Sequence, residues 1–433
     1  MELKDHGPSN PRRKRLVGIY LLTGCLLFLG GLGAVAGPAW ENAGWAMEKK
    51  SGSSDLGSRE VGPMIKLNSL VINLSEDSGR HYLKTTIISD MAIIAFDTPF
   101  RRIWAVVGLL IIAVFPFLAT PFFMHIANLI AIASIGAMAL NLLSGNAGLL
   151  SLGQAGFLAS GAFTTAIMTV NFSMPFWVTI PTAGVVGAIL GFIAGLPSLR
   201  LKGIYLGLST LAMHYVITYA CSEYQFWSGS NFGIVIKPPS IGPLVLAKDR
   251  VWHYFLWIFV GIVGIFITNL LRTRPGRAWT AIRNRDIAAE VMGINIGYYK
   301  VLAFVVSTAI IGMAGSIYAY YTKVASIEEY SFILTISYLA MIISGGMRSV
   351  LGSLMGASLI TSLPYSLIYL FGLFEVSGVL KDYFFSLQSA LFGLVIIVFL
   401  LVEPLGLAEI WRRVRVYFEL WPFRYKPLSV TKR

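Results

Sequence analysis

Long apolar runs recur along most of this 433-residue chain, and they constrain its fold more than any other feature. Runs of roughly 18 residues or more are long enough to cross the hydrocarbon core of a membrane as helices. In lipid, only helices and closed barrels satisfy their own backbone, and the alternating pattern of barrel strands is absent here. With 56% hydrophobic and 13% charged residues, the chain is expected to be an all-α polytopic membrane protein.

The hydropathy pattern predicts about ten transmembrane helices after residue 100. The expected spans are 103–120, 124–143, 147–170, 175–196, 203–221, 251–271, 300–321, 332–346, 350–372 and 384–402. Basic loops stay on the cytoplasmic side, so the loop 272–300 and the tail 411–433 are both expected in the cytoplasm. Counting spans places Arg200 and Lys202 on the same side. The net charge of +13 then reflects membrane orientation, and no nucleic-acid partner is expected.

The first ninety residues have a different character. A basic cluster ends at Arg15, an apolar run from Leu16 to Gly37 predicts a signal anchor, and a polar linker covers 41–63. Two strand-like runs around Glu76–Gly79 predict a hairpin over 65–88. Residues 10–90 resemble the start of the flagellar basal-body-associated FliL family, which has one span, a linker and then an extracytoplasmic domain. The matching strands are Leu70–Leu74 and Arg80–Lys84.

This leading segment conflicts with the ten-span unit. Its anchor would deliver residues 38–100 to the outer side, whereas the first of the ten spans must start inside. We therefore expect residues 1–90 to be a fusion or a gene-model join, with a permease domain over 91–433 that begins naturally at Met91. Mass spectrometry of the native product tests this, since peptides spanning 80–100 would contradict it.

Two polar stretches stand out between the apolar runs. In the first, Asn141 to Gly161, glycines interrupt an apolar run and polar side chains lie at membrane depth. Small residues at such spacing favour close helix packing, and a broken or re-entrant helix that lines a solute pathway fits equally well. The candidate pathway residues are Asn146, Gly148, Ser151, Gly153 and Gln154.

The second stretch, Arg277 to Gly297, lies between two expected spans. From 272 to 300 it carries six basic and two acidic residues. Pro275-Gly276 would end the preceding helix, and an apolar face at helical spacing predicts a short amphipathic helix. The residues of that face are Ile287, Ala288, Val291 and Met292. Spacing alone leaves it open whether this is a solvated basic loop or a docking helix for a soluble partner.

The sequence lacks the patterns that indicate ATP binding, metal binding or coupling to an ion gradient. The sequence lacks a Gly-x-x-x-x-Gly-Lys-Ser/Thr phosphate loop, so it is not expected to bind ATP by that route. The five histidines show no metal spacing, the two cysteines predict no disulfide, and no cofactor is expected. Carriers coupled to protons or sodium generally need buried carboxylates, which are scarce in the expected spans. The energy for any transport is therefore expected to come from another protein.

Residues from about 100 to 425 resemble the LivM-type permease subunit of branched-chain amino acid ATP-binding-cassette (ABC) importers. The matching text is Asn141 to Gly161, Gly195 to Gly207, Ser228 to Ile234, Gly276 to Gly297, Ser344 to Gly356 and Glu403 to Trp411. Two positions depart from the family pattern: Arg348 replaces a small residue, and Pro364-Tyr365 replaces a proline–acidic pair.

The resemblance implies a multi-pass protein of the inner membrane, with no catalysis of its own, that moves leucine, isoleucine, valine or related small solutes. Its implied partners are a homologous LivH-type permease, two ABC ATPases and a periplasmic solute-binding protein. It also implies that the ATPase grips a coupling loop here. The expected coupling-loop residues are Arg283, Asp286, Ala288, Ala289, Glu290 and Gly293.

Two other function classes remain open from the residues. A stand-alone channel or secondary carrier would produce solute flux in liposomes that contain this chain alone. A flagellar-associated membrane protein would depend on residues 1–90, and deleting them while scoring motility against amino-acid uptake would separate that class from an importer.

Overall fold

The computed structural model describes residues 112–230, 232–241, 244–245, 249–373 and 406–411, with isolated positions at 108, 110, 390, 393–394 and 397. The predicted signal anchor, hairpin and FliL-like segment lie outside these residues. So do the basic tail and most of the span expected at 384–402. These expectations therefore remain predictions.

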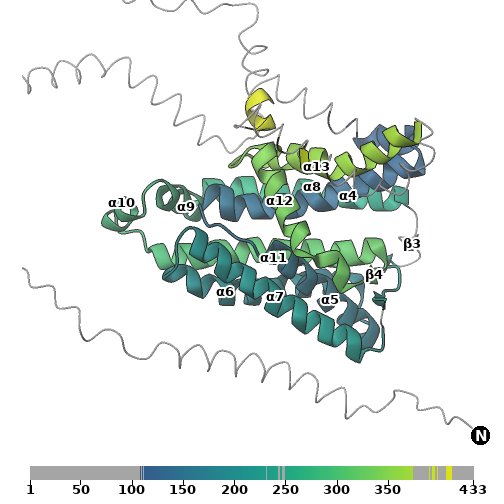
Figure 1. Ribbon diagram of the computed structural model, residues 1–433, viewed down its shortest axis with the longest axis horizontal. Helices are drawn as coiled ribbons and strands as arrows, with labels where there is room; N and C mark the ends of the chain where they lie inside the picture. The colour runs from purple at the N-terminus through teal and green to yellow at the C-terminus, as the bar shows by residue number, and fades with distance from the viewer. Residues whose placement is uncertain are drawn as a thin grey trace, which may run out of the picture. The chain divides into compact units, whose positions relative to one another are not determined.

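Six described helices are long and apolar enough to cross a membrane. With the labels of Figure 1 they are α4 (Pro121–Leu140, continued by the π-helix η1, Asn141–Asn146), α5 (Gln154–Phe172), α6 (Phe176–Gly195, continued by the 3₁₀ turn η2, Leu196–Leu199), α7 (Ile204–Trp227), α8 (Asp249–Arg272) and α11 (Ile296–Thr322). The described part of the chain is thus a polytopic α-helical membrane protein. The expected total of ten spans stays a prediction.

The remaining described elements are short, apart from α13 (Val350–Leu373), which has 24 residues and covers the span expected at 350–372. The short ones are β1 (Ile234–Val235), β2 (Ser240–Ile241), β3 (Leu244–Val245), α9 (Arg274–Asn284), α10 (Asp286–Val291), β4 (Val324–Ala325), the 3₁₀ turn η3 (Ile327–Tyr330) and α12 (Phe332–Gly345). Helix α12 covers the span expected at 332–346. Its 14 residues extend roughly 21 Å, which is short of a hydrocarbon core about 30 Å thick.

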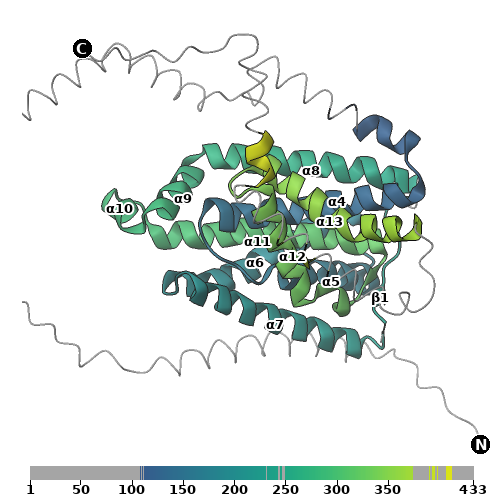
Figure 2. The same cartoon turned by 45° about the horizontal axis from the view of Figure 1, so that its top comes forward.

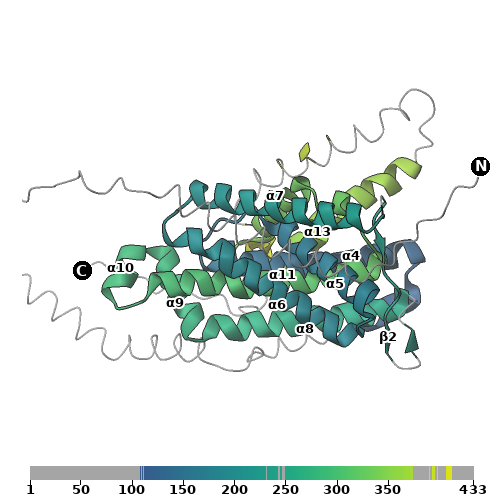
Figure 3. The same cartoon turned by 90° about the horizontal axis from the view of Figure 1, so that it is seen from below.

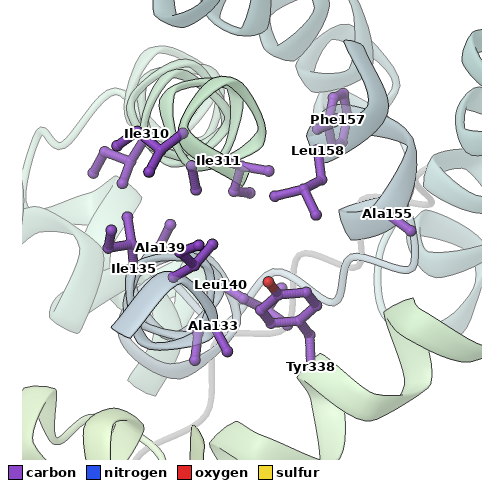
Figure 4. Close-up of a cluster of buried hydrophobic side chains, with 14 of the residues drawn as sticks. Ala133, Ile135, Ala139, Leu140, Ala155, Phe157, Leu158, Ile310, Ile311 and Tyr338 are labelled. Atoms are coloured by element: carbon purple, nitrogen blue, oxygen red, sulfur yellow. The ribbon is translucent and has the colours of Figure 1, made fainter. Parts of the chain in front are cut away.

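The helices differ sharply in how far they are enclosed. In its most apolar window α4 is 89% buried, whereas α8 is only 22% buried. Figure 4 shows why α4 is central: Ile135 and Ala139 of α4 face Ile310 and Ile311 of α11, with Leu158 of α5 closing the cluster. Helix α4 is therefore packed on protein, and α8 keeps most of its apolar surface for lipid or another subunit.

Small antiparallel strand pairs and the basic segment mark opposite ends of the bundle. Strand β1 pairs with β4 through Ile234↔Ala325, and β2 pairs with β3 through Ser240↔Val245. These strands lie at one end in Figures 1 and 3, and α9 and α10 lie at the other. Lys202 is 2.9 Å from Asp286, so the turn after α6 shares the α9–α10 end, as span counting predicts.

Two predicted boundaries are wrong by more than four residues, and one of them is the end of the span expected at 203–221, which continues as α7 to Trp227. The span expected at 147–170 begins as a helix only at Gln154, because residues 147–153 form no helix. Gly148 has a φ of +72°, which cannot continue a right-handed helix. The polar stretch from Asn141 therefore contains a real break, and glycines farther along it, Gly156 and Gly161, pack closely against α7 and α11, so both expected structures are present. A solute pathway along the break stays a prediction.

Candidate functional site

The break between α4 and α5 covers residues 141–153, and we call it the interruption. Helix α4 first widens into a π-helix, in which Ala147 N–H donates to Leu142 O at 3.1 Å. The chain then runs without regular structure to α5. Single π-turns inside helices are rare and frequently mark functional sites, because they expose backbone groups that an α-helix would hide.

Asn141 holds this interruption to the loop between α12 and α13. Its amide donates to Ser349 O at 2.9 Å and to Ser353 Oγ at 2.7 Å, and its Oδ1 accepts from Arg348 N–H at 2.9 Å. Asn141 is 2% exposed. Asn141 is not among the site residues predicted from the sequence, although an asparagine inside an apolar run is a signal of such a role.

The five candidate pathway residues all lie in the interruption or at the start of α5. Gln154 is fully buried, and its Nε2 donates to Gly136 O at 2.9 Å while its Oε1 has no protein partner. Asn146 Nδ2 donates to Asn141 O at 3.3 Å, and Ser151 Oγ accepts from Gly153 N–H at 3.4 Å. Their hydrogen bonds hold the irregular backbone in place, and their contact with a solute remains a prediction.

The interruption is also fixed from the side of α7 and α12. Leu152 N–H donates to Thr210 Oγ1 at 2.8 Å, and Ala155 N–H donates to Thr335 Oγ1 at 3.0 Å. A Cβ added at Gly153 would lie 2.8 Å from Thr210 O. Two threonines therefore satisfy amides that the broken helix leaves free, and a glycine is needed for the close approach of α7.

Helix α9 is anchored on the bundle by its apolar face. Pro275 lies in its first turn, where a missing N–H is tolerated. Trp279 is fully buried, and its Nε1–H donates to Tyr299 O of α11 at 2.7 Å. Ile282, 3% exposed, packs beside it. The basic stretch is thus more than a solvated loop, since its first helix is docked on the protein.

Arg283, near the end of α9, reaches the interruption. Its Nη1–H donates to Gly145 O of η1, and its stem crosses Gly148. A Cβ added at Gly148 would lie 2.8 Å from Arg283 Cγ. Burial, and then the neighbouring charge of Arg348, lower the pKa of the Arg283 guanidinium, which keeps its charge at any physiological pH.

Asp286 ties the start of α10 to two other elements. Its carboxylate lies 2.9 Å from Lys202 Nζ and 3.8 Å from Lys300 Nζ of α11. The hydrogen bond from Lys202 is the main reason that the pKa of Asp286 is below its usual value, with further lowering by the charges of Lys202 and Lys300. The carboxylate is therefore ionised and connects the turn after α6 to the N-terminal end of α11.

Beyond Asp286, α10 turns its apolar side chains outward. Ile287 is 77% exposed, Val291 84% and Met292 69%, whereas only Ala289 is buried against the protein. Ala288, Glu290 and Gly293 are exposed too. The apolar face predicted from spacing exists, but it faces away from the bundle, at the end where α10 projects in Figures 1 and 2.

The predicted coupling-loop residues therefore divide into two groups. Arg283, Asp286 and Ala289 point toward the bundle, and Ala288, Glu290 and Gly293 face outward. Within the described residues, no three His, Cys, Asp or Glu side chains gather as ligands of a metal would. The arrangement offers an exposed surface at one end of a segment whose other side contacts the interruption.

Comparison with known proteins decides the family. Residues 122–400 match the model of the branched-chain amino acid transport system / permease component family. The chain belongs to this family. Over 279 residues it is 32% identical to the high-affinity branched-chain amino acid transport system permease protein LivM of Escherichia coli K12, covering 59% of this chain and 66% of that relative.

Two archaeal relatives extend the comparison. The probable branched-chain amino acid transport permease protein LivM of Methanocaldococcus jannaschii is 28% identical over 232 residues, which cover 52% of this chain and 66% of that protein. The probable permease LivH of the same organism is 24% identical over 274 residues, covering 60% and 84%. The chain spans just under two thirds of the length of these LivM relatives. No solved structure matches it.

Proposed function

We propose that this chain is the transmembrane permease subunit of an ABC importer. It carries leucine, isoleucine, valine or related small solutes across the inner membrane by alternating access, and partner ATPases supply the energy. The observation that carries the proposal is the exposed apolar face of α10, formed by Ile287, Val291 and Met292 on a basic segment at one end of the bundle. An exposed apolar surface outside the membrane is explained by a protein partner that covers it.

The proposed partners are inferred from the family and from the exposed apolar face of α10. One ATPase subunit would bind the exposed side of α10 on this chain, and a second would bind the equivalent surface of a paired permease. Similarity to both a LivM and a LivH relative supports a pair of homologous permeases. A periplasmic binding protein would deliver the solute at the opposite end, near β1 and β4. The basic charge of 272–300 and of the tail supports a cytoplasmic location for α9–α10 and for the C-terminus. Hydrolysis belongs to the ATPases, so this chain is a transport subunit and not an enzyme.

A double substitution tests the docking surface. Glu290→Lys with Gly293→Pro reverses an exposed charge and removes a residue whose φ is +80°, which proline cannot adopt. We expect ATPase co-purification and uptake to be abolished, while insertion into the membrane is kept. Normal uptake by this variant would refute the docking role of α10.

A matched control lies at the other end of the bundle. Gly229 has a φ of +72°, an N–H that donates three residues back, and no atom within 4 Å of an added Cβ, which are the same features as Gly293. Gly229→Pro should therefore carry similar local strain and still retain the ATPase. Loss of the ATPase in the control would mean that strain, and not the surface of α10, explains the result.

A further inference from the structure

The α9–α10 segment and the interruption are joined by a contact whose two sides are far apart in sequence. Arg283 Nη1–H donates to Gly145 O, across 138 residues. Its stem lies on Gly148, where a Cβ would be 2.8 Å from Arg283 Cγ and 3.2 Å from Arg283 Cβ. A charged donor on a backbone carbonyl makes one of the stronger hydrogen bonds in proteins. The side chain is thus held at both its head and its stem.

The rest of the segment supports a rigid connection. Trp279 and Ile282 bury the inner face of α9, and Asp286 pairs with Lys202 and Lys300 just beyond Arg283. Helices α9 and α10 meet at Arg285, whose N–H donates to Ala281 O and whose C=O accepts from Ala289 N–H, so a displacement of α10 would move α9 with it. On the other side, Asn141 binds the interruption to the α12–α13 loop through Ser349 and Ser353. The interruption thus lies between two attachments, one of which is Arg283.

We propose that Arg283 is a positioning residue that transmits movement of the α9–α10 segment to the interruption between α4 and α5. This inference rests on the proposed function, and it assigns Arg283 an inward role distinct from contact with the ATPase. Gly148 is the second part of the device, because its positive φ and missing side chain let the arginine stem cross the break. The contact between Arg283 and the interruption takes part in no chemical reaction, and its effect is mechanical.

The contact itself is tested on the purified subunit, without transport. We expect Arg283→Ala to raise the amide hydrogen exchange of residues 141–153, since Gly145 O loses its donor. Arg277→Ala is the matched control, because it removes the same charge from the exposed side of the same helix. Exchange that is equal in Arg283→Ala and wild type would overturn the proposal.

The transmission is tested in the reconstituted importer with both permeases, the ATPases and the binding protein. We expect Arg283→Ala to keep the ATPases bound and hydrolysing ATP, while solute uptake per ATP falls by about tenfold, a typical size for coupling between sites. Arg283→Lys should recover part of the loss, since an ammonium still donates to one carbonyl. Arg277→Ala should couple like wild type.

Gly148→Ala provides an independent variant, because it displaces the arginine stem without touching the charge. Gly203→Ala is its control: Gly203 also has a positive φ, +58°, but no atom lies within 4 Å of an added Cβ. We expect Gly148→Ala to uncouple uptake and Gly203→Ala to retain it. In the double variant, Gly148→Ala should add little to Arg283→Ala, because both remove one contact.

The outcomes separate this role from the proposed function. Lack of ATP-driven uptake by the wild-type assembly would overturn the proposed function, and this role with it. Wild-type coupling in both Arg283→Ala and Gly148→Ala would overturn the role of Arg283 alone. Loss of the ATPases from Arg283→Ala would also overturn it, since the residue would then serve docking.

Discussion

At the scale of single residues, Asn141 illustrates how one buried amide organises irregular backbone. Its side chain satisfies Arg348 N–H, Ser349 O and Ser353 Oγ, all from the α12–α13 end. A side-chain amide can make all three bonds, because it carries two N–H donors and an acceptor oxygen. Arg348, which departs from the family pattern, has a φ of +76°, a conformation that is unfavourable for residues other than glycine, and the bond from its N–H to Asn141 Oδ1 helps to hold this backbone. Its side chain is exposed and needs no space inside the protein.

Asn141→Ala should therefore lower the free energy of unfolding by about 1–3 kcal/mol, the usual effect of leaving buried polar groups without a partner. Asn141→Asp should do no better, because a carboxylate cannot donate to Ser349 O. Thermal unfolding in detergent measures both. Asn171→Ala, which removes an exposed amide bound to Tyr224, is the control and should change stability little. Equal stability of the Asn141 and Asn171 variants would contradict the role given to Asn141.

Asp286 predicts a pH dependence at the same scale. Because its pKa is lowered in the folded protein, its pairing stabilises the α9–α10 segment above the pKa of the unfolded chain. This stabilisation is lost as the pH falls through the folded value, in the acidic range below about pH 4. Limited proteolysis of residues 284–295 should accelerate there, and Asp286→Asn should accelerate it already at neutral pH. Glu290→Gln, on the exposed side of α10, is the control, and its cleavage should follow wild type.

At the scale of elements, α11 is packed by backbone contact with α5 and α6. A Cβ added at Gly312 would lie 3.3 Å from Gly187 Cα and collide with Ala183 O, and one at Gly315 would lie 2.9 Å from the carbonyl carbon of Leu158. Small residues at helix interfaces allow this approach in membranes, where packing replaces the hydrophobic effect. The packing role that the sequence suggested for small residues is therefore carried mainly by α11 and its neighbours.

Gly312→Ala should lower the free energy of unfolding by about 1–3 kcal/mol, because backbone atoms cannot yield as a side chain could. Gly261→Ala on α8 is the matched control, since no atom lies within 4 Å of its added Cβ. It should be neutral, or stabilising by up to about 1 kcal/mol through helix propensity. Thermal unfolding of the two variants side by side decides the matter: a tolerated Gly312→Ala would show that α11 can shift away from α6.

The same elements show what sequence could foresee. Long apolar runs predicted α6 at 175–196 and α8 at 251–271, within two residues of Phe176–Gly195 and Asp249–Arg272. The start of α5 was misjudged, because residues 147–153 are as apolar as a span and hydropathy carries no information on φ. The pairing of Arg283 with Gly145 crosses 138 residues, so no local periodicity records it. Residue types and their spacing along the sequence identify the interruption and the α9–α10 segment separately, and only the fold shows that the two are in contact.

At the scale of the whole molecule, the two ends of the bundle differ in charge. The end with α9 and α10 carries eight basic and two acidic residues over 200–203 and 272–300, and among the described residues of 223–250 and 323–330 the opposite end carries three basic and four acidic ones. Basic residues near span ends resist translocation, whereas acidic ones contribute little. The fold places 200–203 beside 272–300, so their charges act on the same side. We therefore expect the summed charge of these two loops, which the structure brings together, to set the orientation.

The charge difference between the two ends predicts which end a membrane-impermeant maleimide reaches. In a background in which Cys25 and Cys221 are replaced by serine, Lys237→Cys should be labelled on intact spheroplasts, and Arg285→Cys only after the membrane is opened. Both native residues are exposed, so access and not burial decides the labelling. The reverse pattern would place α10 outside the cell, beyond the reach of any ATPase. It would overturn the proposed function while leaving the helix packing described here intact.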